Sequence, residues 1–440
     1  MKKSILAFIL CTLSAGAFSQ SKVLSLDDCV KITLERNPQL VQSQFYLKIA
    51  GKDVLSGVSR FLPSVDADVG YSHSVAGPSS RLRVDPRSGI PVSERPFEIK
   101  SWSSSAGFSI SESLFNGSNI FGLSRAFSLK KGAEYDFERT RQDLIYRVKE
   151  RYYNLLKSQK LLEVQEETIK SSDESYKRAQ VQYEVGKTSK SDVLKAKVLL
   201  EQSRLSLIGA QNDLSVAKAS LNHVLGFDVD TEIQIMDNTE TPDSDINYKD
   251  AYQNSMKIHP AVLKSKMDVK ASKANIGAAA GQFMPTVGAY YGYSWRNERF
   301  ARINNMFNQD YNWYAGVSFS LPIFTGFSRI ADMGKAQLSY QSSKEALAQM
   351  EKDVALELKQ AYFAMEQAKK KIAVSQDAEI AAEEDLRLNK EKYNLGSGTM
   401  LDLINAQVSY TTSKSDRIQA MYDCKIVQAR LQKAMGTLEK

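Results

Sequence analysis

The sequence predicts a mainly α-helical chain with membrane β-strands. It is built as a duplicated unit of long coiled-coil helical hairpins and has four transmembrane β-strands per chain. Three observations predict this fold class: an internal repeat, heptad-spaced apolar residues in long stretches without proline, and four segments in which apolar and polar residues alternate. Hydrophobic residues make up 42% of the chain and charged residues 25%, so there is material for a buried core.

The first 19 residues have the features of a secretory signal peptide. Lys2 and Lys3 precede an apolar run from Ile5 to Leu13, and small residues follow it. The mature chain is therefore expected to be exported. Removing the two lysines lowers the formal net charge from +7 to +5, and because this charge is spread along the chain, no nucleic-acid partner is expected. No later segment has roughly 18 consecutive apolar residues, so a mature chain that crosses a membrane must do so with strands.

Short motifs that recur at fixed spacings reveal the repeat. Asn37-Pro38 recurs as His259-Pro260, 222 residues later, and Phe61-Leu62-Pro63 recurs at the same spacing as Phe283-Met284-Pro285. Further along each half the spacing becomes 210, as it is between Gly186 and Gly396. We therefore expect a first repeat at residues 20–226, a linker at 227–245 and a second repeat at 246–440.

The helical part of each repeat is expected to form a long antiparallel hairpin. Val148, Leu155 and Leu162 are seven residues apart, and this heptad spacing is typical of coiled-coil packing. The same spacing holds in the second repeat for Leu358, Met365 and Ile372. The hairpins are predicted at about 123–225 and 330–436, with Gly186 and Gly396 supplying the turns at their tips.

Four segments have the period of two that is typical of strands, at about 64–75, 101–115, 285–296 and 311–324. Each has the roughly 9–11 residues needed to cross a bilayer, and the aromatic residues near their ends suit the interfacial girdles of a membrane barrel. A soluble β-sandwich would show the same alternation, but four such strands lie among coiled-coil helices in an exported chain. The polar loops 76–100 and 297–311 are expected on the outer side, which leaves the helices on the periplasmic side.

Four strands cannot close a barrel, and open strand edges are not tolerated in lipid. The chain is therefore expected to oligomerise. Two copies would supply eight strands and three would supply twelve, and membrane barrels are known from eight strands upward. Counting strands leaves both possibilities open.

Taken together, these features resemble the TolC-type outer-membrane efflux proteins over essentially the whole mature chain. The resemblance rests on the signal peptide, the duplicated helix start, the Phe-Leu-Pro strand entry, the Phe-x-Gly strand exit, and Tyr393-Asn394-Leu395-Gly396 followed by Asp402-Leu403-Ile404-Asn405-Ala406-Gln407. It implies a homotrimer whose 12-stranded β-barrel in the outer membrane is continuous with a periplasmic α-helical barrel.

The same resemblance implies the function and the partners. The channel would be the passive exit duct of a tripartite efflux or type I secretion system, with an inner-membrane pump and a periplasmic adaptor (membrane fusion) protein docked on the hairpin tips. The linker residues would lie in the belt around the middle of the tunnel; they include Asp237, Glu240, Pro242, Asp243 and Asp245.

Two sites at the hairpin tips follow from the resemblance. Adaptor contact is expected at Val185, Gly186, Lys187, Thr188, Leu395, Gly396 and Ser397, unless these residues only form the turns. The periplasmic entrance gate is expected at Tyr393, Asp402 and Asn405.

The gate departs from the family pattern at two positions, because Asn405 replaces a second aspartate and Gly398 replaces an arginine. At most one acidic ring is then expected, with weaker block by cations than two rings would give. Asp402 could instead face a neighbouring helix. Its repeat equivalent, Asp192, could be solvated or structural.

No catalytic, cofactor or metal site is expected. Cys11, Cys29 and Cys424 stand far apart, and the three histidines are isolated, with His73 expected near the outer end of a strand and His259 at a helix start. The main alternative function is that of an exported coiled-coil interaction protein without a pore, either an adhesin or a periplasmic adaptor. An adaptor would need a lipoyl-like or β-barrel domain between its hairpin arms, which this chain lacks. The substrate is left open among drugs, metal ions and proteins.

Overall fold

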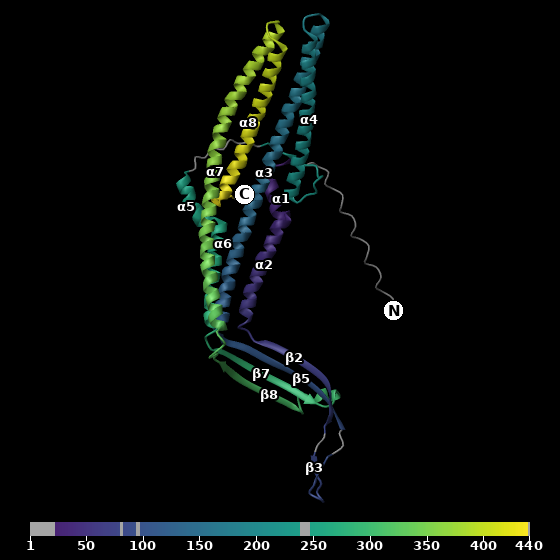
Figure 1. Ribbon diagram of the computed structural model, residues 1–440, viewed down its shortest axis with the longest axis vertical. Helices are drawn as coiled ribbons and strands as arrows, with labels where there is room; N and C mark the ends of the chain where they lie inside the picture. The colour runs from purple at the N-terminus through teal and green to yellow at the C-terminus, as the bar shows by residue number, and fades with distance from the viewer. Residues whose placement is uncertain (1–22, 80–81, 94–96, 238–246, 439–440) are drawn as a thin grey trace, which may run out of the picture. The chain divides into compact units, whose positions relative to one another are not determined.

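The computed structural model describes residues 23–79, 82–93, 97–237 and 247–438, which form two compact units (Figure 1). The first unit combines Met1–Tyr46, Glu134–Lys264 and Ala348–Lys440, and the second combines Leu47–Ala133 and Ser265–Leu347. Each unit therefore takes residues from both sequence repeats. The expected signal peptide and the linker residues Glu240, Pro242, Asp243 and Asp245 lie outside the described residues.

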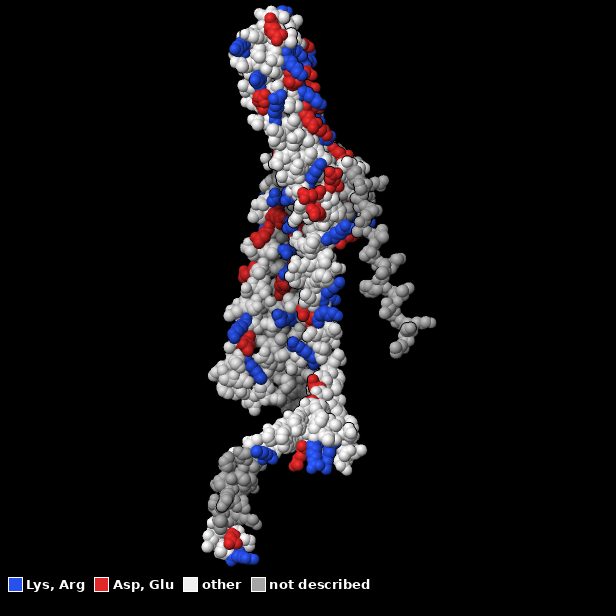
Figure 2. Space-filling view, turned by 90° about the vertical axis from the view of Figure 1, so that its right-hand side faces the viewer, with Lys and Arg blue, Asp and Glu red and all other residues white. Residues whose placement is uncertain are grey.

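Helices dominate the chain. They are α1 (Leu26–Arg36), α2 (Pro38–Ser59), α3 (Gly117–Glu184), α4 (Lys190–Leu225), α5 (Tyr248–Ile258), α6 (Pro260–Gly281), the short 3-10 helix η1 (Phe300–Asn305), α7 (Ser328–Asn394) and α8 (Met400–Met435). Within the described ranges, none of these helices combines the length and the apolar character that a membrane-crossing helix needs. In Figure 2, basic and acidic side chains are interspersed over the helices, as expected of surfaces in contact with water.

The strands of the second unit form one antiparallel sheet in the order β2-β5-β7-β8. These strands are β2 (Ser64–Ser79), β5 (Phe97–Asn116), β7 (Thr286–Asn297) and β8 (Tyr311–Ser320). The pairing of β5 with β7 joins the two repeats, and β2 and β8 are the edges of the sheet. Two short pairs complete the described strands: β3 (Leu82–Val84) with β4 (Pro91–Ser93), and β1 (Val23–Leu24) with β6 (Gln234–Ile235).

The strand register gives the sheet two different faces. Residues directly opposite each other on neighbouring strands point to the same side. One row across all four strands is Ala67, Phe108, Tyr293 and Trp313, and the next row, on the other side, is Asp68, Gly107, Ser294 and Asn312. We call the first side the apolar face; further rows on it contain Val65, Ile110, Tyr291, Ala315, Val69, Ala106, Trp295 and Tyr311. The visible part of the sheet in Figure 2 is almost free of charged side chains except at its end.

Strand β8 is shorter than the sequence pattern suggests, because it ends at Ser320 rather than near residue 324. Pro322 has no N–H to donate to the strand ladder, and Gly326 and Phe327 both have positive φ angles, of 60° and 64°. The corresponding stretch of the first repeat has no proline, so β5 continues to Asn116. There the Asn116 side chain accepts a hydrogen bond from the Asn119 N–H at 3.2 Å, and α3 begins at once, six residues before the expected start at 123.

Heptad-spaced residues form much of the core of the first unit. Val148 and Leu155 are fully buried in a cluster that also contains Tyr152, Leu221 and Leu225. In the second repeat, Leu358 and Met365 are buried in a separate cluster around α7 and α8, whereas Leu162 and Ile372 are only half buried. Cys29 belongs to the first cluster and Cys424 to the second, and both are buried free thiols.

The duplicated helix starts have the same geometry despite their different side chains. Asn37 accepts a hydrogen bond from the Gln39 N–H through Oδ1 at 2.9 Å, and His259 accepts one from the Ala261 N–H through Nδ1 at 3.3 Å. Burial lowers the pKa of His259, which favours the neutral imidazole that this acceptor role requires. His259 therefore takes the place of the capping asparagine in the second repeat.

Candidate functional site at the hairpin tips

The first helix of each hairpin ends in the same turn. Gly186 and Gly396 have φ angles of 73° and 77°, a left-handed conformation that costs other residues free energy. At the first tip, the Gly186 N–H donates to the Tyr183 carbonyl at 2.9 Å and the Lys187 N–H donates to the Gln182 carbonyl at 2.8 Å. The second tip repeats both bonds at 3.1 and 3.0 Å. This pair of bonds is the Schellman motif, so the glycines end α3 and α7 for a local reason.

The second helix of each hairpin begins at a capping box. In α8, the Asp402 N–H donates to Thr399 Oγ1 at 3.1 Å, while Asp402 Oδ2 accepts from the Thr399 N–H at 3.2 Å and from its hydroxyl at 2.6 Å. In α4, Ser189 and Asp192 form the same box, and Asp192 Oδ2 also accepts from the Thr188 hydroxyl at 3.0 Å. Both aspartates therefore stabilise a helix start.

Hydrogen bonding lowers the pKa of both capping carboxyl groups. The bonds from Thr399 hold the pKa of Asp402 below its ordinary value. Burial acts to raise the pKa of Asp192, but the bonds from Ser189 and Thr188 outweigh it and the pKa is lowered. Asp402 is exposed in the single chain, and Asn405, one turn further along α8, is exposed as well.

Most of the tip residues named from the sequence are exposed. Val185 has 63% of its surface accessible and Leu395, its repeat equivalent, has 84%. Gly186, Lys187, Gly396 and Ser397 are also exposed. Thr188 differs from them, because it is half buried and its hydroxyl is bonded to Asp192. Large apolar side chains thus lie open at the tips of both hairpins.

A small apolar cluster joins the two hairpins next to the tips. We call it the tip cluster; its buried members are Ala179 of α3, Ala196 of α4, Tyr393 of α7, and Met400 and Leu403 of α8. An exposed hydrogen bond from Arg178 Nη1 to Asn394 Oδ1, at 2.7 Å, lies at the same level. The hairpins are therefore held together at their tips by a few contacts.

Tyr393 is the largest residue of the tip cluster, with 7% of its surface exposed. Its hydroxyl lies beside Thr188 and Asp192 of the first hairpin, but makes no hydrogen bond of good geometry within the described part of the chain. Burial raises the pKa of this phenol above its ordinary value. Tyr393 therefore contacts the first hairpin mainly through its ring.

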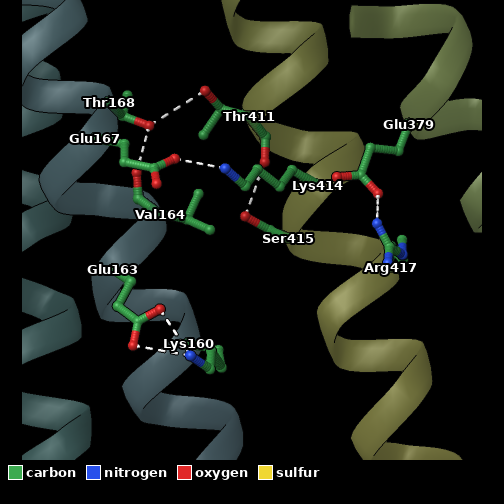
Figure 3. A network of polar contacts seen from close by, with 10 residues as sticks. All are labelled: Lys160, Glu163, Val164, Glu167, Thr168, Glu379, Thr411, Lys414, Ser415 and Arg417. Atoms are coloured by element: carbon green, nitrogen blue, oxygen red, sulfur yellow. Dashed lines mark hydrogen bonds and ion pairs between the residues drawn. The ribbon is translucent and has the colours of Figure 1, made fainter.

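Further from the tips, polar contacts connect α3 and α8 (Figure 3). Lys414 forms an ion pair with Glu167 at 2.5 Å, and the hydroxyls of Thr168 and Thr411 are 3.3 Å apart. Gln407 donates to the Ser172 hydroxyl at 3.2 Å, in a layer that is buried. Exposed ion pairs contribute little to the free energy of folding. Buried polar groups must be paired, so the polar contacts mainly fix how the two hairpins align.

The residues named from the sequence lie at or next to the tips, but the sequence reasoning did not predict their hydrogen bonds. The capping boxes were visible as Ser-x-x-Asp and Thr-x-x-Asp at equivalent places in the two repeats. The buried Ser172 was a weaker signal, since it is a small polar residue on the helix face that also carries Val164 and Ala179. No sequence pattern pairs Thr168 with Thr411, because they are 243 residues apart.

A comparison with known families decides what kind of protein carries these tips. The family model described as outer membrane efflux protein matches residues 30–227 and 251–437, one match in each repeat. The chain belongs to the outer membrane efflux protein family. It is accordingly a protein of the outer membrane, with its helical part in the periplasm, and it serves as an efflux duct.

Three known proteins are similar to the chain over most of its length. The outer membrane protein TolC of Vibrio cholerae is 21% identical over 450 residues, an alignment that covers 100% of this chain and 97% of that protein. The outer membrane channel CmeC of Campylobacter jejuni has a TM-score of 0.81 at 18% identity and covers 94% of this chain and 85% of its own. The open state of the MtrE outer membrane channel of Neisseria gonorrhoeae has a TM-score of 0.77 at 20% identity, covering 93% and 88%.

These structural similarities show the shared fold, and the family is one of passive outer-membrane channels. The alternative of an exported coiled-coil protein without a pore finds no support in the comparisons.

Proposed function

We propose that three copies of this chain close one 12-stranded barrel and form the exit duct of a tripartite efflux or type I secretion system. The observation that carries the proposal is the four-stranded sheet with one apolar face and two open edges, β2 and β8. In lipid, each unpaired peptide group at an edge costs several kcal/mol, so the edges need partners. Pairing β8 of one copy with β2 of the next satisfies both edges and turns the apolar faces towards lipid.

The duct is passive. Efflux family members of this type are trimeric channels that work with an adaptor and an inner-membrane pump, and we assign the same partners to this chain. The pump supplies energy and selects the cargo, and the chain itself performs no chemistry.

We place adaptor contact at the two tips, over Val185, Gly186, Lys187 and Thr188 and over Leu395, Gly396 and Ser397. The exposure of Val185 and Leu395 supports this assignment, because an apolar side chain at the end of a rigid hairpin gains free energy when a partner covers it. The equivalent turns let a partner hairpin meet both tips in a similar way.

We assign the periplasmic entrance to Tyr393, Asp402 and Asn405, with a different part for each residue. Tyr393 packs the second hairpin against the first. Asp402 caps α8 through Oδ2 and carries the charge that would line the opening in a trimer. Asn405 lies near Asp402 on α8 and is uncharged, so it adds no second acidic ring. The ring of Asp402 carboxylates alone would attract cations.

A matched pair of substitutions on β8 tests the orientation of the sheet. Val317 lies on the apolar face and Ser318 on the opposite face. An arginine on the lipid-facing side of a barrel costs about 2–4 kcal/mol at mid-bilayer, whereas one facing the lumen costs little. Val317→Arg should therefore sharply reduce the yield of detergent-extracted trimer from outer membranes, while Ser318→Arg trimers should conduct ions in planar bilayers. Equal yields of the two variants, or a purified chain that stays monomeric without detergent, would contradict the channel.

A further inference from the structure

The loop between β7 and β8 folds back over the apolar face of the sheet. The Phe300 ring meets Tyr71 edge to face at 6.4 Å, and Phe307 stacks on Tyr293 at 5.6 Å. The Tyr293 hydroxyl donates to the Met306 carbonyl at 2.7 Å. Trp295, two residues after Tyr293 on the same face, is only 1% exposed. The loop is therefore a built part of the face.

Two polar bonds close the base of this loop. Asn297 Nδ2 donates to Asp310 Oδ2 at 2.6 Å, and Asn297 Oδ1 accepts from the Arg299 N–H at 2.9 Å. The first bond ties the start of the loop to its end and the second is local to its start, so the position of η1 is specified by both polar and apolar contacts.

A shallow groove of about 720 Å³ lies between η1 and the extended β2–β5 pair. Its lining residues are Tyr71, Trp102, Glu298, Arg299, Phe300 and Ala301. Tyr71 stacks on Trp102 with ring centroids 5.5 Å apart, and His73 stacks on the same residue at 3.9 Å. The floor is thus a row of aromatic rings that remain about half exposed.

The rim of the groove carries basic side chains. Arg299 lines the groove and precedes η1 in an extended conformation, and Arg302 lies in η1, where its N–H donates to the Arg299 carbonyl at 3.1 Å. Both are exposed. The lining itself contains one basic and one acidic residue, Arg299 and Glu298, and the exposed Arg302, which follows the lining residue Ala301, adds a second positive charge beside it. Arg296 pairs with Ser105 in the register and therefore belongs to the opposite face of the sheet.

We propose that this groove binds an anionic phospholipid, with an acyl chain on the aromatic floor and the phosphate at Arg299 and Arg302. The proposal rests on the proposed function, which turns the apolar face towards lipid. A free phosphate would leave the aromatic floor unused, and a neutral lipid would leave the arginines unused. The groove lies at the end of the sheet that carries the expected outer loops, so the lipid belongs to the outer leaflet.

Tryptophan fluorescence can test the groove directly, because Trp102, Trp295 and Trp313 are the three tryptophans of the chain. Trp313→Phe removes the one that lies open on the apolar face, and the buried Trp295 supplies a constant signal. This trimer is reconstituted into vesicles that contain, at equal mole fractions, either brominated phosphatidylglycerol or brominated phosphatidylcholine. Bromine on the acyl chain quenches Trp102 when the lipid occupies the groove.

We expect stronger quenching by brominated phosphatidylglycerol than by brominated phosphatidylcholine, and we call the ratio of the two the selectivity. In Arg299→Gln this selectivity should fall by about fivefold, since one arginine contributes about that factor to binding near an anionic lipid surface. Arg296→Gln is the matched control, with the same change of charge on the opposite face, and should keep the selectivity. Arg302→Gln provides a second test that leaves the residue at the base of the loop intact.

Equal quenching of the parent by both lipids, or an equal loss of selectivity in Arg296→Gln, would overturn the groove as a lipid site while leaving the channel standing. Failure of both lipids to quench Trp102 would likewise overturn the groove as a lipid site, and the channel would still be decided by the Val317→Arg and Ser318→Arg pair.

Discussion

Replacing Tyr393 with alanine should release the tip of the second hairpin from the first. The ring is buried among Ala179, Ala196, Met400 and Leu403. Two of these neighbours are alanines on long helices, which have no side chain to move into the space. The substitution therefore leaves a cavity that cannot collapse, and truncating a buried aromatic residue costs about 3 kcal/mol or more.

This loss acts on the contact between hairpins because the buried neighbours of Tyr393 include α3 and α4 residues of the first hairpin as well as α8 residues of its own. If most of the 3 kcal/mol destabilises the joined state and not the separated state, the equilibrium shifts roughly 100-fold towards separated tips. A closed entrance that opens rarely would then be open for a substantial part of the time.

The assay is single-channel recording of purified trimers in planar bilayers at neutral pH. Tyr393→Ala should raise the open fraction strongly. Tyr393→Phe is the control, because it keeps the ring and removes a hydroxyl that has no hydrogen bond of good geometry in the described residues, and it should resemble the parent. Since burial raises the pKa of the phenol, the parent stays uncharged under these conditions. Recordings of Tyr393→Ala that match the parent, or a Tyr393→Phe channel that opens as Tyr393→Ala does, would refute packing by the ring as the closing contact.

Three further predictions concern charge, pH and hairpin alignment. Asp402→Asn should weaken the block by divalent cations in bilayer recordings. Thr399→Ala removes the capping hydroxyl but keeps the charge of Asp402, and should leave the block unchanged. If Asp402→Asn is blocked as strongly as the parent, Asp402 does not line the pore. Burial lowers the pKa of His259 from its ordinary 6.5, so below pH 6.5 the unfolded chain takes up a proton more readily than the folded chain does. The stability that neutral His259 contributes is therefore complete above pH 6.5 and is lost as the pH falls through the lowered pKa. His259→Asn should abolish the part of the fall in melting temperature between pH 7 and pH 5 that this residue causes. The hydroxyls of Thr168 and Thr411 are 3.3 Å apart, so cysteines at these two positions should form a disulfide on oxidation. The disulfide should hold α3 to α8 and lower the open fraction of the channel until a reductant is added. Unchanged gating of the oxidised variant would mean that the hairpins open without separating at this level.

The turns and helix starts of the tips were predictable because they depend on neighbouring residues. Gly186 and Gly396 adopt left-handed conformations wherever the rest of the chain lies, and the serine or threonine three residues before each capping aspartate completes a local bond pattern. The four strands were predictable for the same reason, since alternation shows in ten residues or fewer. Their ends were harder to predict, and Pro322 shows that one residue without an N–H ends a strand that the alternation would continue.

Amino-acid order alone determined the duplication, the long hairpins, the tip turns and the two faces of the sheet, because each depends on periodic spacing or on a few adjacent residues. Only the tertiary structure decided that Tyr393 packs against the first hairpin, that Thr168 meets Thr411, and that the loop around Phe300 lies on the apolar face. These contacts join residues that are distant in the chain, and their geometry depends on how whole helices and strands pack. No local pattern can encode that.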